Sequence, residues 1–277
     1  MSHWLQWDRV SELVRVLVTG GSGYIGENLQ ALLVAEGHEV VNYDLDEGND
    51  IRDPDVLIWS TIDAEAVVHL AAISGVPACE EDPYTAQTTN IGGTVNVAHA
   101  CAVRGIPLVF ASSFAALDGS TAYGRQKAWG EQIIRDYPEL RASILHFSNV
   151  YGGPNYLARK DSVIAKFIKM GRAGDPLTIF GDGEQTRDFI HVDDICFAIL
   201  HCLVYNKFGS FDICTGSMTT VNAIADIVAE HFGARKVFAD GHGTYSSPEG
   251  DSAGTRNELG TPEPQTIDDE VRRLCAS

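Results

Sequence analysis

The apolar positions of this chain fall into short runs that alternate with longer amphipathic stretches. The short runs predict buried strands at residues 16–19, 39–44, 66–72, 107–113 and 141–147. Apolar residues at helical spacing predict helices at 24–36, from 55 onward, at 83–103 and at 121–137. Strands that alternate with helices in this way are typical of a parallel, doubly wound α/β sheet.

Beyond residue 150 the pattern becomes irregular. It predicts short strands at 177–180 and 211–214, helices at 163–170, 192–205, 220–232 and 266–274, and loops at 151–155 and 241–264. We therefore expect a parallel-sheet domain at residues 1–150 and a smaller mixed lobe at 151–277. About residues 188–214 of the lobe should pack back on the first domain. A cleft between the two parts would be the place where their ligands meet.

A glycine cluster separates the first predicted strand from the first predicted helix. Its glycines match a dinucleotide fingerprint in two overlapping ways, as Gly21-x-Gly23-x-x-Gly26 and as the wider Gly20-x-x-Gly23-x-x-Gly26. Glycine removes side chains where the backbone must approach a pyrophosphate, and the helix then directs its free N–H groups and its positive dipole end at that pyrophosphate. The run from strand to helix therefore predicts a dinucleotide site.

An acidic residue, Asp44, ends the second predicted strand. It lies 18 positions beyond Gly26, near the spacing expected for a carboxylate that bonds the adenosine ribose. Since a carboxylate repels a 2′-phosphate, this residue favours NAD over NADP. The alternative is a strand-end aspartate that only caps a turn.

Composition excludes several classes of partner. The net charge of −18 over 277 residues disfavours binding to nucleic acid or to an anionic membrane surface. No apolar stretch is long enough to span a membrane, and the first eight residues lack the basic start and apolar core of a signal peptide, so we expect a cytoplasmic protein. The sequence contains no Cys-x-x-Cys pair, so a metal site is not expected. We expect buried free thiols at all six cysteines, Cys79, Cys101, Cys196, Cys202, Cys214 and Cys275.

Three residues predict hydride chemistry beside the dinucleotide. Tyr123 and Lys127 are four positions apart, so they share one face of a helix, and Ser113 ends the neighbouring strand. A free tyrosine, with a pKa of ~10, is a poor base at neutral pH, but a nearby ammonium favours its phenolate. Such a tyrosine could move a proton while a hydride passes to a nicotinamide. His69 could also be catalytic, although its place inside a strand favours a core histidine.

These residues resemble those of the extended short-chain dehydrogenases/reductases, in the NAD-dependent nucleotide-sugar epimerase/dehydratase group. The resemblance covers almost the whole chain, at residues 19–26, 44, 69–72, 90–94, 112–113, 123–127, 148–152 and 181–194. It implies that the domain at 1–150 is an NAD-binding Rossmann domain and that the ligand of the smaller lobe is a nucleotide-sugar substrate. It also implies a homodimer, which such enzymes form through helices like 83–103 and 121–137. The apolar residues Ala98, Ala102, Trp129, Ile133 and Ile134 suit that packing, or packing on the sheet.

The resemblance also implies a role for each matching residue. Tyr123 would be the base, Lys127 would bond the nicotinamide ribose, and Ser113 would be the partner of Tyr123 that holds the substrate oxygen. The residues implied to bind NAD are Gly20, Gly23, Tyr24, Ile25, Gly26, Asp44, Ile51, Asp53, Leu70, Ala71, Ala72, Asn90, Tyr123 and Lys127. Those implied to bind substrate are Ser113, Asn149, Leu177, Thr178, Phe180 and Arg187. Two alternatives remain: Arg187 as a surface ion pair with Asp188 or Glu184, and Asn149 as a turn residue.

Departures from the family pattern narrow the reaction. The dehydratases carry an acidic pair after the strand-end hydroxyl, where this chain has Phe114 and Ala115, so elimination of water is not expected. Only ten positions separate Ser113 from Tyr123, where the family usually has a longer loop. Glu249 stands near the position at which the family often has an arginine that binds the diphosphate. The favoured function is an NAD-dependent epimerase acting at C4, of the UDP-glucose/UDP-galactose type. An NAD(H)-dependent sugar dehydrogenase or ketoreductase, or a non-catalytic NAD-binding protein, are the alternatives.

Overall fold

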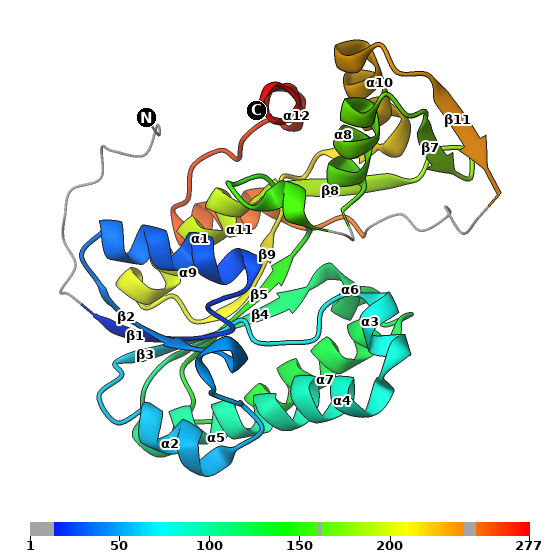
Figure 1. Cartoon of the computed structure of the whole chain (residues 1–277). Helices are drawn as coiled ribbons and strands as arrows, with labels where there is room; N and C mark the ends of the chain where they lie inside the picture. Colours follow the sequence, from blue (N-terminus) through cyan, green and yellow to red (C-terminus); the bar gives the residue numbers. More distant parts are fainter. Residues whose placement is uncertain (1–13, 160–161, 241–247) are drawn as a thin grey trace.

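The computed structural model describes residues 14–159, 162–240 and 248–277. Within them a six-stranded, all-parallel sheet runs in the order β2-β1-β3-β4-β5-β9 (Figure 1). Its strands are β1 (Arg15–Thr19), β2 (Glu39–Tyr43), β3 (Ala66–His69), β4 (Leu108–Ser113), β5 (Ala142–Phe147) and β9 (Gly209–Ile213). The structure confirms the predicted doubly wound α/β fold.

Helices cover both faces of this sheet (Figure 1). One face carries α1 (Tyr24–Ala35) and α9 (Val192–Tyr205); the other carries α2 (Pro54–Ser60), α3 (Val76–Glu81), α4 (Pro83–Gln87), α5 (Thr94–Arg104) and α7 (Ala122–Arg135). Because side chains alternate along a strand, Val16 and Val18 pack in the core that includes α9, whereas Leu17 packs in the core that includes α5. Burial on both faces explains why the strands appear in the sequence as continuous apolar runs.

The predicted helix at 83–103 contains a widened turn. The helical run passes from α4 through a π-helical turn (Thr88–Gly93) into α5. A side chain at Gly93 would lie 2.7 Å from Ile51 Cγ1, whereas Gly92 has open space around it. Close packing against Ile51 therefore explains one glycine of the pair.

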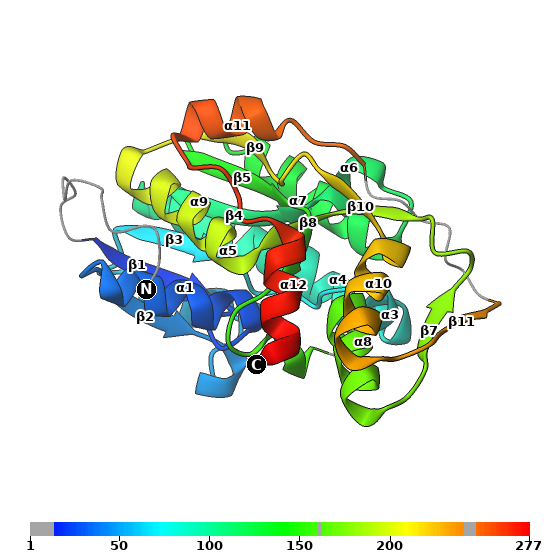
Figure 2. The same cartoon turned by 90° about the horizontal axis from the view of Figure 1, so that it is seen from above.

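The remaining elements form a smaller, mixed assembly. It contains a three-stranded sheet of β6 (Asn149–Tyr151), β8 (Thr186–His191) and β10 (Met218–Thr220), and a pair of parallel strands, β7 (Leu177–Phe180) and β11 (Lys236–Ala239). The helices α8 (Val163–Ala173), α10 (Val221–Phe232) and α12 (Ile267–Ala276) share a core with β7 and β8. Seen from above, α12 crosses between this assembly and the helices α1 and α9 (Figure 2). The domain boundary at residue 150 stays a prediction.

Three short helices differ from the sequence prediction, and one of them, α3, lies in a stretch where no element was predicted. Residues 252–259, predicted as loop, form α11 (Ser252–Leu259), because Asp251 Oδ1 accepts a hydrogen bond from Gly254 N at 2.8 Å and Leu259 is buried in the main core. The short connection after Ser113 forms α6 (Phe114–Asp118). The predicted loop at 241–247 and the absence of a signal peptide at the N-terminus concern residues outside those described.

In the described ranges, no helix combines the length and the apolar character needed to cross a membrane. Each of the six cysteines is a buried free thiol, as the sequence predicts.

Candidate active site

The glycine turn between β1 and α1 leaves no room for side chains. Gly20 has a φ of +71°, and a Cβ there would lie 2.6 Å from Ala71 N. A Cβ at Gly26 would lie 2.6 Å from Gly21 Cα. Gly23 is the N-cap of α1 and supplies no side-chain cap, which leaves the first-turn N–H groups of this helix to other partners. This cradle at a helix N-terminus fits the pyrophosphate of a dinucleotide.

Asp44 reaches from the end of β2 to the glycine turn. Its Oδ2 accepts a hydrogen bond from Ser22 N at 3.0 Å, and its Oδ1 accepts one from Asp46 N at 3.1 Å. Asp44 therefore caps a turn, which was the alternative interpretation, and also lies against the predicted dinucleotide site. Since a carboxylate can accept about four hydrogen bonds, it retains capacity for ribose hydroxyls.

The exit of β3 meets the same turn. Leu70 N donates to Thr19 O at 3.0 Å, and Ala71 N contacts Thr19 Oγ1 at 3.3 Å. Together with the crowding of Gly20 against Ala71, these bonds hold residues 70–72 beside the glycines. The two segments that sequence reasoning assigned to the cofactor thus lie side by side.

The remaining predicted cofactor residues have structural partners of their own. The Tyr24 hydroxyl donates to Gly152 O at 2.6 Å, and burial raises its pKa far above the usual range. Ile25 packs on the main core, and Ile51 is buried with its carbonyl bonded to Asn96. Asp53 caps α2 by accepting from Asp55 N at 3.1 Å. Their contact with a cofactor stays a prediction.

Tyr123 and Lys127 share one face of α7, as their spacing predicts. Lys127 is 5% exposed; its Nζ lies 6.0 Å from the centroid of the Tyr123 ring and donates to Ala111 O at 2.7 Å. Burial lowers the pKa of Lys127 to about 8. Because the ammonium has a carbonyl and aromatic rings around it, its charge acts on Tyr123 with little screening by water.

Ser113 lies at the end of β4, where it begins α6. Its Oγ accepts a hydrogen bond from Ala115 N at 3.2 Å. Helix α6 then packs on the first turn of α7 so closely that a side chain at Gly124 would lie 2.8 Å from Ala115 C. This contact brings the Ser113 turn against the helix turn that carries Tyr123.

His69 is a core histidine. It is 1% exposed, and its two ring nitrogens contact the hydroxyls of Thr19 at 2.7 Å and Thr94 at 3.1 Å. Burial, aided by the charge of Lys127, lowers its pKa to about 3, so the ring is neutral.

Asn90 connects the loop after β3 to α7. Its Oδ1 accepts from Ile73 N at 2.8 Å, and its Nδ2 donates to Ile73 O at 3.0 Å and to Gln126 Oε1 at 2.7 Å. The amide thus holds the loop, while its predicted contact with the cofactor stays a prediction. Gln126, which precedes Lys127, was not identified from the sequence, although its place beside Lys127 was a signal.

The predicted diphosphate residues lie on adjacent strands. Asn149 in β6 donates from Nδ2 to Asp188 O at 3.0 Å, and Arg187 precedes Asp188 in β8. The Asp188 carboxylate accepts hydrogen bonds from Ser148, Thr215 and Gly216, including 2.7 Å from Gly216 N. That carboxylate is therefore largely committed to partners other than the arginine.

Strand β7 carries the residues predicted to contact the nucleotide base. Leu177 is fully buried in the core of the smaller assembly, whereas Thr178 is half-buried and Phe180 is 56% exposed at the strand end. Burial leaves only the backbone of Leu177 available to a ligand. The aromatic face of Phe180 is accessible.

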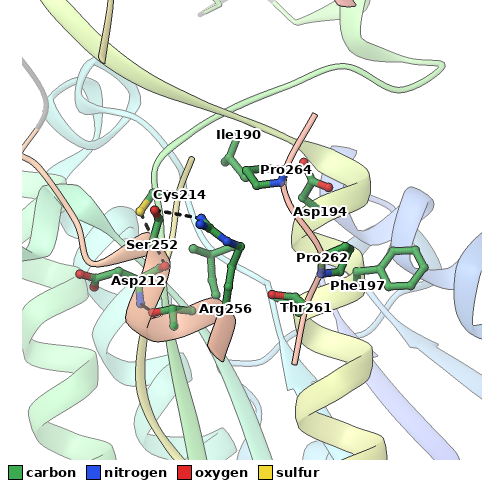
Figure 3. Close-up of a pocket in the computed structure, with 13 residues that line it drawn as sticks. Ile190, Asp194, Phe197, Asp212, Cys214, Ser252, Arg256, Thr261, Pro262 and Pro264 are labelled. Carbon is green, nitrogen blue, oxygen red and sulfur yellow. Dashed lines mark hydrogen bonds between the residues drawn. The ribbon is translucent and has the colours of Figure 1, made fainter. Parts of the chain in front are cut away.

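Two cavities lie among the helices α1, α9, α11 and α12, away from Tyr123. A cavity of about 30 Å³ lies between α9, β9 and α11, and Arg256 extends into it while the Asp212 carboxylate points away (Figure 3). A groove of about 560 Å³ lies between α1, α9 and α12, with Asn28, Cys196 and Leu274 in its walls. Neither contains a predicted catalytic residue.

Sequence reasoning also missed a buried charged cluster around Glu131 and His146. Two signals were present: Glu131 lies four residues after Lys127, and His146 interrupts an apolar strand. Because the two residues lie on different elements, no local spacing in the sequence relates them.

Comparison with known proteins identifies the class to which this fold and site belong. Residues 16–214 match the NAD dependent epimerase/dehydratase family, and the chain belongs to this family of enzymes. This membership confirms NAD as the expected cofactor and confirms the resemblance to extended short-chain dehydrogenases/reductases.

Several relatives are named as sugar-nucleotide 4-epimerases, and others as sugar-nucleotide decarboxylases or as a reductase. A Methanocaldococcus jannaschii protein proposed to be a UDP-glucose 4-epimerase is 34% identical over 268 residues, covering 84% of this chain and 86% of its own. The UDP-glucuronic acid 4-epimerase from Bacillus cereus, solved with UDP-glucuronic acid and NAD, is 26% identical with a TM-score of 0.84 over 95% of this chain and 98% of its own. The UDP-glucose 4-epimerase from Thermus thermophilus, solved with NAD, is 25% identical with a TM-score of 0.82 over the same shares.

Proposed function

We propose that this protein is an NAD-dependent nucleotide-sugar 4-epimerase of the UDP-glucose/UDP-galactose type. The observation that carries the proposal is the buried Lys127 ammonium, 6.0 Å from the Tyr123 ring on a helix packed against the Ser113 turn. A tyrosine beside a buried ammonium can take a proton from a sugar hydroxyl, and the dinucleotide cradle lies beside it. Similarity to 4-epimerases at 25–34% identity over most of the chain supports the same reaction.

NAD would be held by the β1–α1 turn. The backbone of Gly20, Gly23 and Gly26 would accommodate the pyrophosphate, Asp44 would bond the ribose, and residues 70–72 would line the nicotinamide half. When bound, NAD supplies the chemistry of accepting a hydride and returning it. A carboxylate at Asp44 would disfavour the 2′-phosphate of NADP.

Tyr123 would act as the base on the sugar hydroxyl at C4. Lys127 would stabilise the phenolate by its charge, and its bond to Ala111 O keeps the ammonium in place. Ser113 would hold the reacting oxygen. Tyr123 would remove the proton from O4 while the sugar is oxidised at C4, and would return it to O4 once hydride has come back to the other face of the turned keto sugar, so that epimerisation needs no added acid.

The nucleotide would be held by the smaller assembly. Arg187 and Asn149, on adjacent strands, would bond the diphosphate, since a guanidinium can bond two oxygens at once. Phe180, with its exposed ring, and Thr178 would contact the base, with Leu177 contributing its backbone. Glu249 is exposed, so its side chain can turn away from an anionic ligand.

The two residues after Ser113 argue against a reaction that eliminates water. Phe114 is buried, and a side chain at Gly250 would lie 3.0 Å from its Cε2 atom, while Ala115 packs against Gly124. Neither side chain can transfer a proton, so a reaction that eliminates water lacks its acid at these positions.

The test is a turnover screen over UDP-, GDP- and dTDP-sugars, with product analysis and NADH absorbance recorded together. Interconversion of UDP-glucose and UDP-galactose without net NADH supports the proposal. Stoichiometric NADH change would support the dehydrogenase or ketoreductase alternative. No turnover with any sugar would leave the non-catalytic alternative.

A homodimer through α4, α5 and α7 is part of the proposal. Trp129 is 63% exposed and Tyr84 is 78% exposed on this side, while Ala98 and Ile134 are buried against the sheet. Ala102 and Ile133 are half-buried. Burying Trp129 in a second copy would remove a large apolar surface from water. Light scattering that gives a dimer for the wild type and a monomer for Trp129→Lys would support this arrangement.

A further inference from the structure

A buried cluster of charged side chains lies one helical turn beyond Lys127. Glu131 shares the α7 face of Lys127, and its side chain is 8% exposed; the side chain of His146, from β5, is 7% exposed. His146 Nε2 lies 3.1 Å from Glu131 Oε1, and His146 Nδ1 lies 2.9 Å from Asp212 Oδ1, on β9. The proposed chemistry assigns no role to these groups.

The geometry around the ring favours a charged imidazole. A neutral imidazole has one N–H and one lone pair, so one of its nitrogens would direct a lone pair at a carboxylate oxygen. An imidazolium instead donates to both carboxylates. In agreement, although burial opposes the charge, the bonds to Asp212 and Glu131 raise the pKa of His146 to about 9.

Charges in the cluster are balanced. Two carboxylates, Glu131 from α7 and Asp212 from β9, face the ring, and Arg135 from α7 bonds Glu131 Oε2 at 3.1 Å. From β4, Ser112 contributes only a hydroxyl. Two anions are thus matched by two cations, and loss of the charge on His146 would leave a buried carboxylate without its partner.

The cluster connects the parts that carry the proposed site. Ser112, directly before Ser113, donates from Oγ to Glu131 Oε1 at 2.5 Å. On the other side, Asp212 Oδ2 accepts from Asp251 N at 3.1 Å. The adjoining Gly250 packs on Phe114, directly after Ser113. One ring therefore joins α7, the end of β4 and the segment before α11.

We propose that His146 is a positioning residue for the reaction of Tyr123. As an imidazolium it holds Glu131 and Asp212 together, and so fixes the helix that carries Tyr123 and Lys127 against the strand end that carries Ser113. The proposal rests on the proposed function, because it assumes that these three residues perform the chemistry. Both ring nitrogens are bonded to carboxylates, so His146 acts through them.

The first test compares His146→Gln, which removes the charge, with His146→Arg, which keeps it. Because misplacing reacting groups lowers the rate of chemistry, His146→Gln should reduce kcat about tenfold or more and change KM by less than about twofold. His146→Arg should restore most of kcat. His38→Gln is the matched control, since His38 is buried, its Nδ1 accepts a hydrogen bond from Val14 N just before β1, and within the described residues its ring bonds to no carboxylate.

A purely structural role would give a different result. If His146→Gln lowered the melting temperature but kept the wild-type kcat, the positioning role would be overturned. If His146→Gln did not fold, Asp212→Asn would replace it. The Asp212 side chain is 23% exposed, and the substitution removes one of the two carboxylates that bond the His146 ring. A fall in kcat at constant KM in Asp212→Asn supports the proposal, and a wild-type kcat contradicts it.

The second test needs no turnover. Nitrogen-15 spectra of the nine histidine rings should show, at pH 8, a ring with both nitrogens protonated whose signals are absent in His146→Gln. A His146 ring that is neutral at pH 7 would overturn the proposal. Since this spectrum is independent of substrate, a failed sugar screen would refute the proposed function and leave the charge of His146 separately tested.

Discussion

Replacing Lys127 by methionine isolates the charge that the proposed reaction needs. The substitution keeps an unbranched apolar chain in the buried site and removes only the ammonium. Lys127 Nζ lies 6.0 Å from the centroid of the Tyr123 ring. With an effective dielectric constant of about 20, the ammonium and a phenolate charge taken at the ring centroid interact by about 3 kcal/mol.

That energy sets the expected loss of rate. About 3 kcal/mol corresponds to roughly a 100-fold fall in kcat, because each 1.4 kcal/mol is about tenfold. The contribution of Lys127 also depends on pH. Since burial lowers its pKa to about 8, the part of the rate that depends on the ammonium is full below pH 8 and is lost as the pH rises through 8.

The assay is interconversion of UDP-glucose and UDP-galactose at saturating NAD, from pH 6 to pH 9.5. At saturating NAD, a lower rate reports slower chemistry and not weaker binding of the cofactor. Lys166→Met, an exposed lysine on α8, is the matched control and should behave like the wild type. If Lys127→Met folded, bound NAD and retained kcat within about threefold of the wild type, the role of the ammonium would be refuted.

Three further predictions address the cofactor site and the charged cluster. Gly20→Ala and Gly105→Ala both place alanine at a positive φ, but of the two only Gly20 is crowded by neighbouring atoms. Gly105→Ala should therefore lower the stability by about 1 kcal/mol, whereas Gly20→Ala should lower it more and abolish NAD binding, as measured by thermal unfolding with and without NAD. Asp44→Asn should weaken the preference for NAD over NADP by about tenfold, as measured by titration with each cofactor; an unchanged ratio would remove Asp44 from the ribose site. Because the pKa of His146 in the folded chain, about 9, lies above its unfolded value, its stabilisation is full below about pH 6.5 and is lost as the pH rises through 9, so the difference in urea stability between wild type and His146→Gln should shrink over that interval.

The main sheet could be predicted because its strands are buried on both faces. This burial makes β1, β3 and β4 continuous apolar runs, and the glycine turn fixes the strand-to-helix transition. The strands β6, β8 and β10 were not predicted, because β6 and β10 have three residues each and β8 begins with polar residues such as Thr186 and Arg187. Pairing with distant segments stabilises them, and a local pattern does not contain that information.

The candidate site divides in the same way. The pairing of Tyr123 with Lys127 follows from helix periodicity alone, so four residues of sequence were enough to predict it. The contacts of His146 with Glu131 and Asp212 join residues 15 and 66 positions apart on three elements. Only the folded sheet brings those elements together, and no spacing rule relates them.

The most direct test of the central claim follows the hydrogen at C4. UDP-glucose carrying deuterium at C4 is incubated with the protein and NAD, and the product is examined by NMR while NADH absorbance is recorded. The proposed function predicts UDP-galactose that retains deuterium at C4, with no net NADH. Replacement of the deuterium by solvent hydrogen, accumulation of NADH, or recovery of only unchanged UDP-glucose would contradict it.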